Sequence, residues 1–158
     1  MHLFRPFLCL ILLCPLVSHA EQQWYDYDRL YIQAGTYTHY TSSSEHSGPN
    51  VLISIEAVKS NDWLYGLALF DNSFGQFSQY AYLGKSWNYH GLFEGFYTKM
   101  TVGLIHGYRG EFKDKIPLNE LGIAPAIIPS LGYKNGRYGA DVIMLGLAGL
   151  LFTVGMEL

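Results

Sequence analysis

Beyond its first twenty residues, the chain has no cysteine and no long hydrophobic run. Both cysteines, Cys9 and Cys14, precede Ala20. After Ala20, no uninterrupted apolar segment approaches the roughly 18 residues that a membrane-spanning helix needs. Disulfides and cysteine chemistry are therefore excluded for the rest of the chain, and a membrane helix is disfavoured.

The first twenty residues have the pattern of a secretory signal peptide. Arg5 precedes an apolar run over residues 7–17, and the small-x-small sequence at 18–20 closes the segment. Such a segment is removed on export. We therefore expect residues 1–20 to be a signal peptide and residues 21–158 to form one domain.

The chain also lacks a basic block and the short motifs of common cofactor sites. It has 10 Lys and Arg against 13 Asp and Glu, and no positive patch of the kind that nucleic-acid-binding proteins carry. No metal-ligand spacing, glycine-rich phosphate loop or GxSxG elbow is present. The nearest approach to a zinc site, formed by His39, Glu45 and His46, is too loosely spaced. We expect no nucleic-acid partner and no cofactor.

What the chain has instead is aromatic residues and glycine, arranged in short strands. It contains 13 Tyr, 9 Phe, 3 Trp and 17 Gly. Alternation of residue type between turn sequences predicts about eight strands, at residues 29–40, 50–59, 63–71, 78–87, 92–108, 121–133, 138–146 and 150–158. Eight antiparallel strands can close a small barrel. The predicted fold is therefore all-β, an eight-stranded antiparallel transmembrane β-barrel with an apolar lumen.

The turns and aromatic residues are typical of an outer-membrane barrel. Tight turns at 60–62, 87–91 and 134–137 alternate with longer ones at 41–49, 72–77 and 109–120. Outer-membrane barrels have short periplasmic turns and longer external loops. Aromatic residues near strand ends fit the interfacial belts of such proteins, namely Trp24, Tyr25, Tyr27, Trp63, Trp87 and Tyr89. The predicted location is the outer membrane of a Gram-negative cell.

The predicted lumen is largely apolar. The segments 63–70, 121–133 and much of 142–151 are apolar on both faces, which disfavours an aqueous channel. Scattered polar groups come from Gln33, Ser54, Glu56, Lys85, Lys99 and Asp141. The last strand alternates, with Phe152, Val154, Met156 and Leu158 predicted outside and Thr153, Gly155 and Glu157 inside. A small barrel holds either packed side chains or one slender ligand such as a hydrocarbon chain, and both alternatives remain open.

Two prolines interrupt the apolar strand at 121–133. Proline has no N–H to donate to a ladder and is normally excluded from central strands. Pro125 and Pro129 therefore predict a local gap in the sheet. In a membrane barrel, such a gap could admit a lipid.

Several segments resemble the lipid A palmitoyltransferase (PagP) family of the Gram-negative outer membrane. The similarity covers Tyr-Asp-Arg-Leu-Tyr-Ile-Gln-Ala-Gly-Thr-Tyr at 27–37, the segment 63–73, GFYTKMTVGLIHGYR at 95–109 and the proline-rich segment 116–133. The chain is also similar to uncharacterised PagP-like proteins that carry Asn-Ser-Phe-Gly-Gln, here at 72–76.

The resemblance implies a barrel that takes an acyl chain from a phospholipid into its interior and transfers it to lipid A. The family uses a histidine, an aspartate and a serine. The family histidine falls at or beside Thr38, which makes His39 the candidate. The Asp-Ser pair falls on Asn72-Ser73, with Asp71 adjacent as the orienting group. The segment 21–28 is too short for the family's N-terminal amphipathic helix.

Chemistry and topology point to the same region of the chain. Acyl transfer needs a base or nucleophile and donors for the developing oxyanion. If both termini are periplasmic, His39, Asp71, Ser73 and His106 all lie at the external rim. Polar groups for substrate binding are predicted there from Gln76 and from Arg109, Lys113 and Lys115, the last three as phosphate-binding cations.

Each of these residues also has a structural interpretation. The histidines could order loops, Ser73 could serve its turn, Gln76 could be an ordinary polar residue at a strand end, and the charged segment 108–115 could be a solvated loop. The alternative function is a non-enzymatic outer-membrane barrel that binds lipid or a small solute, including a possible transporter.

Overall fold

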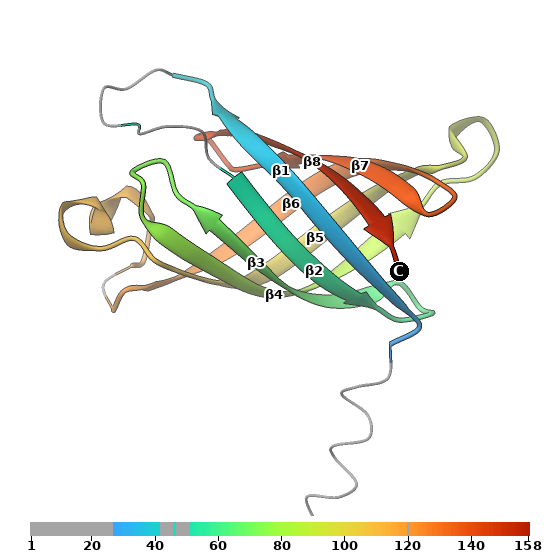
Figure 1. Cartoon of the computed structure of the whole chain (residues 1–158), viewed down its shortest axis with the longest axis horizontal. Helices are drawn as coiled ribbons and strands as arrows, with labels where there is room; N and C mark the ends of the chain where they lie inside the picture. The colour runs from blue at the N-terminus through green and yellow to red at the C-terminus, as the bar shows by residue number, and fades with distance from the viewer. Residues whose placement is uncertain (1–26, 42–45, 47–50, 120) are drawn as a thin grey trace, which may run out of the picture.

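The computed structural model describes residues 27–41, 46, 51–119 and 121–158. The predicted signal peptide, the segment 21–26 with Trp24 and Tyr25, and Glu45 lie outside the described residues. Figure 1 shows the strands as one tilted ring of arrows. They are β1 (Arg29–His39), β2 (Val51–Val58), β3 (Trp63–Asp71), β4 (Phe77–Asn88), β5 (Phe96–His106), β6 (Ile123–Asn135), β7 (Tyr138–Met144) and β8 (Gly149–Glu157).

The strands form a closed antiparallel barrel. Each strand pairs with its neighbours in chain order, and β1 pairs with β8 from Tyr31↔Glu157 to His39↔Gly149, which closes the ring. Closure leaves no sheet edge free along that seam. The predicted all-β, eight-stranded antiparallel barrel is confirmed. Among the described residues, no helix is long and apolar enough to cross a membrane.

The strand limits differ most from expectation at β5. The predicted strand at 92–108 begins only at Phe96, because a 3-10 turn, η1 (Gly91–Phe93), precedes it. Gly91 has a φ of 68°, a conformation that glycine adopts without steric cost. The β4–β5 connection therefore runs over residues 89–95, and the prediction of a tight turn there was wrong. A second 3-10 turn, η2 (Gly110–Lys115), lies in the β5–β6 connection.

The barrel wall is apolar outside and partly polar inside. Ile53, Ile127 and Val154 point outward and are 62%, 71% and 67% exposed. Glu56 and Asp141 point inward and are 4% and 3% exposed. The predicted alternation of the last strand is confirmed for its central residues, since Thr153 is buried while Phe152 and Val154 are exposed. The outer face of the strands is therefore apolar, and their buried charged residues lie on the inner face.

The polar lumen residues meet in one network instead of being scattered. Lys99 Nζ donates to Glu56 Oε1 at 2.8 Å and lies 3.8 Å from Asp141 Oδ1. Gln33 Nε2 donates to Asp141 Oδ2 at 3.1 Å, and Ser54 Oγ donates to Gln33 Oε1 at 3.1 Å. The network thus crosses the lumen from β2 to β5 and β7. Lys85 is an exception, because its Nζ lies 5.5 Å from the Trp63 ring centroid on the outer wall.

Two lumen tyrosines complete the network by lying across glycines. Tyr82 OH donates to Glu56 Oε1 at 3.0 Å, and Tyr97 OH donates to Asp141 Oδ1 at 2.7 Å. The glycines opposite them, Gly66 and Gly132, leave room for the rings, since a Cβ would lie 2.6 Å from the Tyr82 ring and 2.2 Å from the Tyr97 ring. Glycine at these positions therefore permits the tyrosines to reach the carboxylates.

Gly132→Ala is expected to destabilise the barrel by about 1–3 kcal/mol, because the added methyl group forces the Tyr97 ring away from Asp141. The measurement is urea unfolding of the refolded protein in detergent micelles. Ala140→Val is the control, because it enlarges a side chain on the exposed outer wall of the neighbouring strand β7. Equal stability of the two variants would contradict the packing argument.

The half of the lumen nearest the ends of β1, β3 and β5 is apolar. Its buried residues include Leu52, Ala68 and Leu151. Half-buried apolar residues pack against them, among them Phe70, Ile105, Ala126, Ile128 and Ile143. The prediction of an apolar lumen therefore holds for this half. The network centred on Lys99 lies in the other half.

Candidate active site at the barrel rim

The predicted site residues come from strands that end at the same end of the barrel. β1 ends at His39, β3 at Asp71 and β5 at His106. Figure 1 shows these strand ends together with the β3–β4 turn and the η2 loop, opposite the β4–β5 and β6–β7 connections. We call this end of the barrel the rim. Because odd-numbered strands of an antiparallel barrel run in one direction, the topology alone brings these segments together.

His39 and Ser73 are in direct contact at the rim. His39 Nε2 and Ser73 Oγ are 2.7 Å apart, although the residues are 34 positions apart in the chain. β2 stands between β1 and β3, and among the described residues its ladder with β1 runs to Thr36↔Val51. His39, three residues further along β1, reaches the turn after β3. A histidine nitrogen this close to a serine hydroxyl is the geometry of a base and a nucleophile.

Asn72 holds the turn that presents Ser73. Its side chain is fully buried, and its Oδ1 accepts from the backbone N–H groups of Phe74 and Gln76, both at 3.0 Å. Its Nδ2 donates to the buried Ser78 Oγ at 3.1 Å. Asparagine commonly bonds to the backbone two residues on in turns. Asn72 therefore fixes the position of Ser73 but does not contact its hydroxyl.

Tyr37 is a site residue that the sequence did not single out. Its hydroxyl donates to Ser73 Oγ at 3.1 Å. Its ring lies 5.0 Å from the His39 ring in an edge-on arrangement at 74°. The two residues are two positions apart in β1 and so share the inward face of the strand. The spacing of two residues from His39 was the sequence signal that could have identified Tyr37.

The structure does not bring Asp71 to the His39–Ser73 pair. Asp71 is exposed, and among the described residues it makes no hydrogen bond or ion pair with either partner. Its neighbour Phe70 packs against the lumen cluster, so strand alternation turns Asp71 outward. The residue that stacks on His39 is instead His46, with ring centroids 3.8 Å apart and an interplanar angle of 22°.

Gln76 and Arg109 join the Ser73 turn to the loop after β5. Gln76 Nε2 donates to the Arg109 carbonyl at 3.2 Å, and Gln76 Oε1 accepts from the Arg109 N–H at 3.0 Å. The Gln76 amide is therefore engaged with backbone in this structure. His106 pairs with Gln79 and Ile123 in the sheet, and no contact joins it to the His39–Ser73 pair among the described residues.

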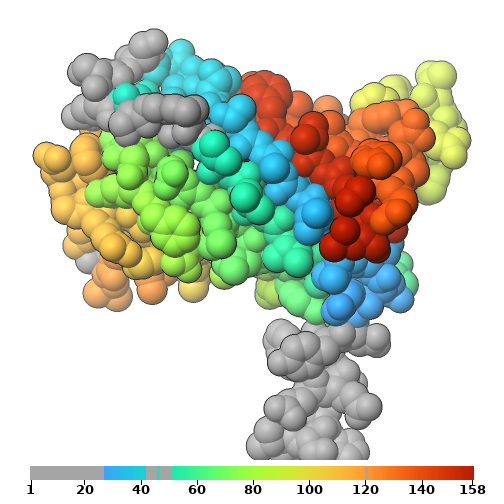
Figure 2. All heavy atoms as spheres, viewed as in Figure 1, coloured from blue at the N-terminus to red at the C-terminus, as the bar shows by residue number. Residues whose placement is uncertain are grey.

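Aromatic packing fixes the same loop against the turn. Phe74 stacks on Phe112 with centroids 4.2 Å apart and an angle of 10°, and Lys115 Nζ lies 5.6 Å from the Phe74 ring centroid. Burial, more than the nearby Tyr37, raises the pKa of Tyr108, which lies edge-on to Phe74. Figure 2 shows this loop packed beside the ends of β3 and β4. The turn that carries Ser73 is thus supported from two sides.

Both prolines lie in a part of β6 that has no partner on one side. The β6–β7 ladder covers only Ser130–Asn135, paired with residues 143–138. The β5–β6 ladder runs without a break from Tyr133 to Ile123, past Pro129 and Pro125. The segment 123–129 therefore lacks a β7 partner, and the missing proline donors break no ladder with β7. The gap lies on the rim side of the barrel.

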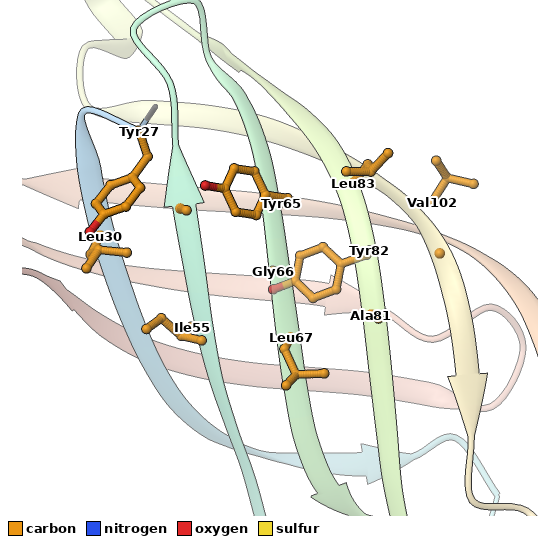
Figure 3. Close-up of a pocket in the computed structure, with 12 residues that line it drawn as sticks. Tyr27, Leu30, Ile55, Tyr65, Gly66, Leu67, Ala81, Tyr82, Leu83 and Val102 are labelled. Carbon is orange, nitrogen blue, oxygen red and sulfur yellow. The ribbon is translucent and has the colours of Figure 1, made fainter. Parts of the chain in front are cut away.

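A groove of about 640 Å³ lies on the outer wall, away from the rim. It crosses β1 to β5 and is lined by apolar side chains, including Ile55, Leu67, Leu83 and Val102 (Figure 3). Small residues such as Ala57 and Ala81 form part of its lining. None of the predicted site residues lines it.

No known protein family matches the chain, and no curated protein matches it.

Proposed function

We propose that this protein is a PagP-like acyltransferase of the Gram-negative outer membrane, which moves an acyl chain from a phospholipid to lipid A. The observation that carries the proposal is the 2.7 Å contact between His39 Nε2 and Ser73 Oγ at the mouth of an apolar lumen. A base and a nucleophile in contact can open an ester, and the lumen beside them suits a hydrocarbon tail.

The outer wall supports a position within a membrane. Its exposed residues are large and apolar around the whole ring, and charged residues of the strand centres are buried inside. Most strands have 8 to 13 residues, close to the 9 to 11 that a tilted strand needs to cross a bilayer. Exposed aromatic residues gather at the end opposite the rim, as an interfacial belt would, namely Trp63, Trp87, Tyr89, Phe96, Tyr133 and Tyr138.

In the proposed reaction, His39 acts as the general base and Ser73 as the nucleophile. Ser73 Oγ bonds to the ester carbonyl carbon while its proton moves to His39 Nε2. The ester C–O bond then breaks, and the departing glycerol oxygen takes the proton from His39. A hydroxyl of lipid A attacks the acylated serine in the same way, which regenerates the Ser73 hydroxyl. No metal ion or redox partner enters this balance.

The unpaired part of β6 supports lateral entry of the acyl chain. The segment 123–129 has no β7 partner, and Pro125 and Pro129 lie within it. An acyl chain passing there would reach the apolar half of the lumen, which Ala126 and Ile128 of the same segment line. The prolines would keep the passage open, because they cannot donate to a ladder.

The lumen network argues against the alternative of a small-solute transporter. Side chains from β1, β2, β4, β5 and β7 meet across the barrel centre, and Glu56, Lys99 and Asp141 are each at most 5% exposed. A solute would have to break buried ion pairs to pass, at a cost of several kcal/mol. A lumen blocked by this network is compatible with an enzyme whose substrates enter from the membrane.

The proposed function predicts a lipid A species that is heavier by one acyl chain. The protein would be expressed in an outer membrane that lacks its own lipid A palmitoyltransferase, and lipid A would be examined by mass spectrometry. His39→Ala and Ser73→Ala, at matched abundance, are each expected to reduce the new species by a factor of about 10³ or more, because the pair acts as a unit.

His90→Ala and Ser86→Ala are the matched controls. His90 is exposed in the β4–β5 connection, and Ser86 lies near the same end of β4, so neither touches the rim. Both should retain the wild-type lipid A profile. Unchanged lipid A in cells that contain the folded wild-type barrel would overturn the transferase proposal and favour a barrel that only binds lipid.

A further inference from the structure

We propose that Tyr37 is a third catalytic group of the rim site, whose hydroxyl donates first to Ser73 Oγ and then to the carbonyl oxygen that becomes negative during acyl transfer. This inference rests on the proposed acyltransferase function. It assigns the oxyanion donor that the chemistry requires and that the sequence left unidentified.

The hydrogen bonds of Ser73 define the direction in which its hydroxyl proton points. Tyr37 OH donates to Ser73 Oγ at 3.1 Å, so it occupies an acceptor position of that oxygen. A serine hydroxyl has one proton to donate, and the remaining partner is His39 Nε2 at 2.7 Å. Tyr37 thereby directs the Ser73 proton toward the base. His39 accepts that proton in the tautomer whose Nε2 is unprotonated, which is the tautomer that a general base needs.

The position of Tyr37 suits a bound ester. Tyr37 is half-buried, belongs to the inward face of β1 and packs against the apolar lumen cluster that includes Leu52 and Leu151. An acyl chain with its carbonyl carbon at Ser73 and its tail in that half of the lumen passes beside Tyr37. Among the described residues, Tyr37 and His39 are the side chains that hydrogen-bond to Ser73 Oγ.

The hydroxyl is free to change its acceptor during the reaction. When Ser73 Oγ bonds to the carbonyl carbon, the electron pair of the C=O bond moves to the carbonyl oxygen. The charge on the serine oxygen falls as the charge on the carbonyl oxygen grows, so the better acceptor for Tyr37 becomes the carbonyl oxygen. Tyr37 keeps its own proton throughout, and the only proton transferred is the one between Ser73 and His39.

Tyr37→Phe tests the inference because it removes one oxygen atom and leaves the ring. With phospholipid donor and lipid A in mixed micelles, kcat is expected to fall by a factor of about 10²–10³, with a smaller change in KM. A fluorophosphonate that labels the wild-type serine should label this variant more slowly by a comparable factor. Tyr40→Phe is the matched control, because Tyr40 is exposed and lies beyond the end of the same strand.

A second measurement separates catalysis from packing. The urea midpoint of Tyr37→Phe in detergent micelles should stay close to that of wild type while its kcat falls, because the ring that packs against the lumen cluster is kept. A kcat within a factor of two of wild type in Tyr37→Phe, or a urea midpoint that falls together with kcat, would overturn the role of Tyr37 and leave the acyltransferase proposal standing. A wild-type protein that neither transfers acyl chains nor reacts with the fluorophosphonate would overturn both.

Discussion

Lys99→Met is expected to lower the free energy of unfolding by about 3–5 kcal/mol, because it leaves two buried carboxylates without their cation. Lys99 Nζ lies 2.8 Å from Glu56 Oε1 and 3.8 Å from Asp141 Oδ1, and the Lys99 side chain is 5% exposed. Methionine fills a similar volume, so the loss reports charge and not packing. The measurement is urea unfolding in detergent micelles, followed by tryptophan fluorescence.

A double variant gives a second test. Adding Glu56→Gln to Lys99→Met should recover part of the loss at neutral pH, since one buried charge then disappears. A single-variant loss below about 1 kcal/mol at neutral pH would contradict a buried, coupled network.

Lys85→Met is the matched control for this experiment. Lys85 lies on the outer wall over the Trp63 ring, with Nζ 5.5 Å from the ring centroid. A cation–π contact at an exposed site contributes about 0.5–1 kcal/mol. The two lysines therefore differ in burial and in carboxylate partners while the chemical change is the same.

Asn72→Ala is expected to reduce acyl transfer by a factor of about 10², because a displacement of about 1 Å at a reacting group has that effect. The substitution removes the acceptor for the N–H groups of Phe74 and Gln76 and the donor to Ser78 Oγ. These groups lie at a fully buried position, so the free energy of unfolding should also fall, by about 2–4 kcal/mol. Lipid A mass spectrometry and urea unfolding measure the two effects.

Asn72→Asp is the control for the turn. An aspartate can accept from the same two backbone N–H groups, and the Ser78 hydroxyl can turn from the Gln76 carbonyl to the carboxylate in place of the lost amide bond. Most of the activity should therefore remain. If Asn72→Ala kept full transfer, Ser73 would not depend on this turn for its position. If Asn72→Asp and Asn72→Ala lost activity equally, the side-chain oxygen would not be the group that matters.

The strands and their order could be predicted because they depend on local properties of the chain. Alternation of outward and inward residues has a period of two, and it located all eight strands, including the inward Thr153 and outward Val154 of the last strand. The direction of odd-numbered strands then gathered His39, Ser73 and His106 at one end. The same alternation would have turned Asp71 outward had it been applied to Phe70 and Asp71.

The contacts within the site could not be predicted from local pattern. His39 meets Ser73 through a contact between residues 34 positions apart, which no local pattern sets. The Gln76 side chain bonds to the Arg109 backbone, 33 residues away, whereas it was predicted as a substrate contact. The gap beside Pro125 was foreseen from proline chemistry, but its extent follows from where β7 stops pairing.

By itself, the sequence determined an eight-stranded antiparallel barrel, the face to which most strand residues point and the end at which the candidate residues gather, because these follow from residue type, spacing and strand direction. The tertiary structure decided which inward residues lie at the same height along the barrel axis. Glu56, Lys99 and Asp141 form one network although Glu56 and Lys99 are 43 residues apart. Tyr37, His39 and Ser73 form one site that joins β1 to the turn after β3. The register between strands sets these heights along the axis, and register is a property of the closed ring, not of any one strand.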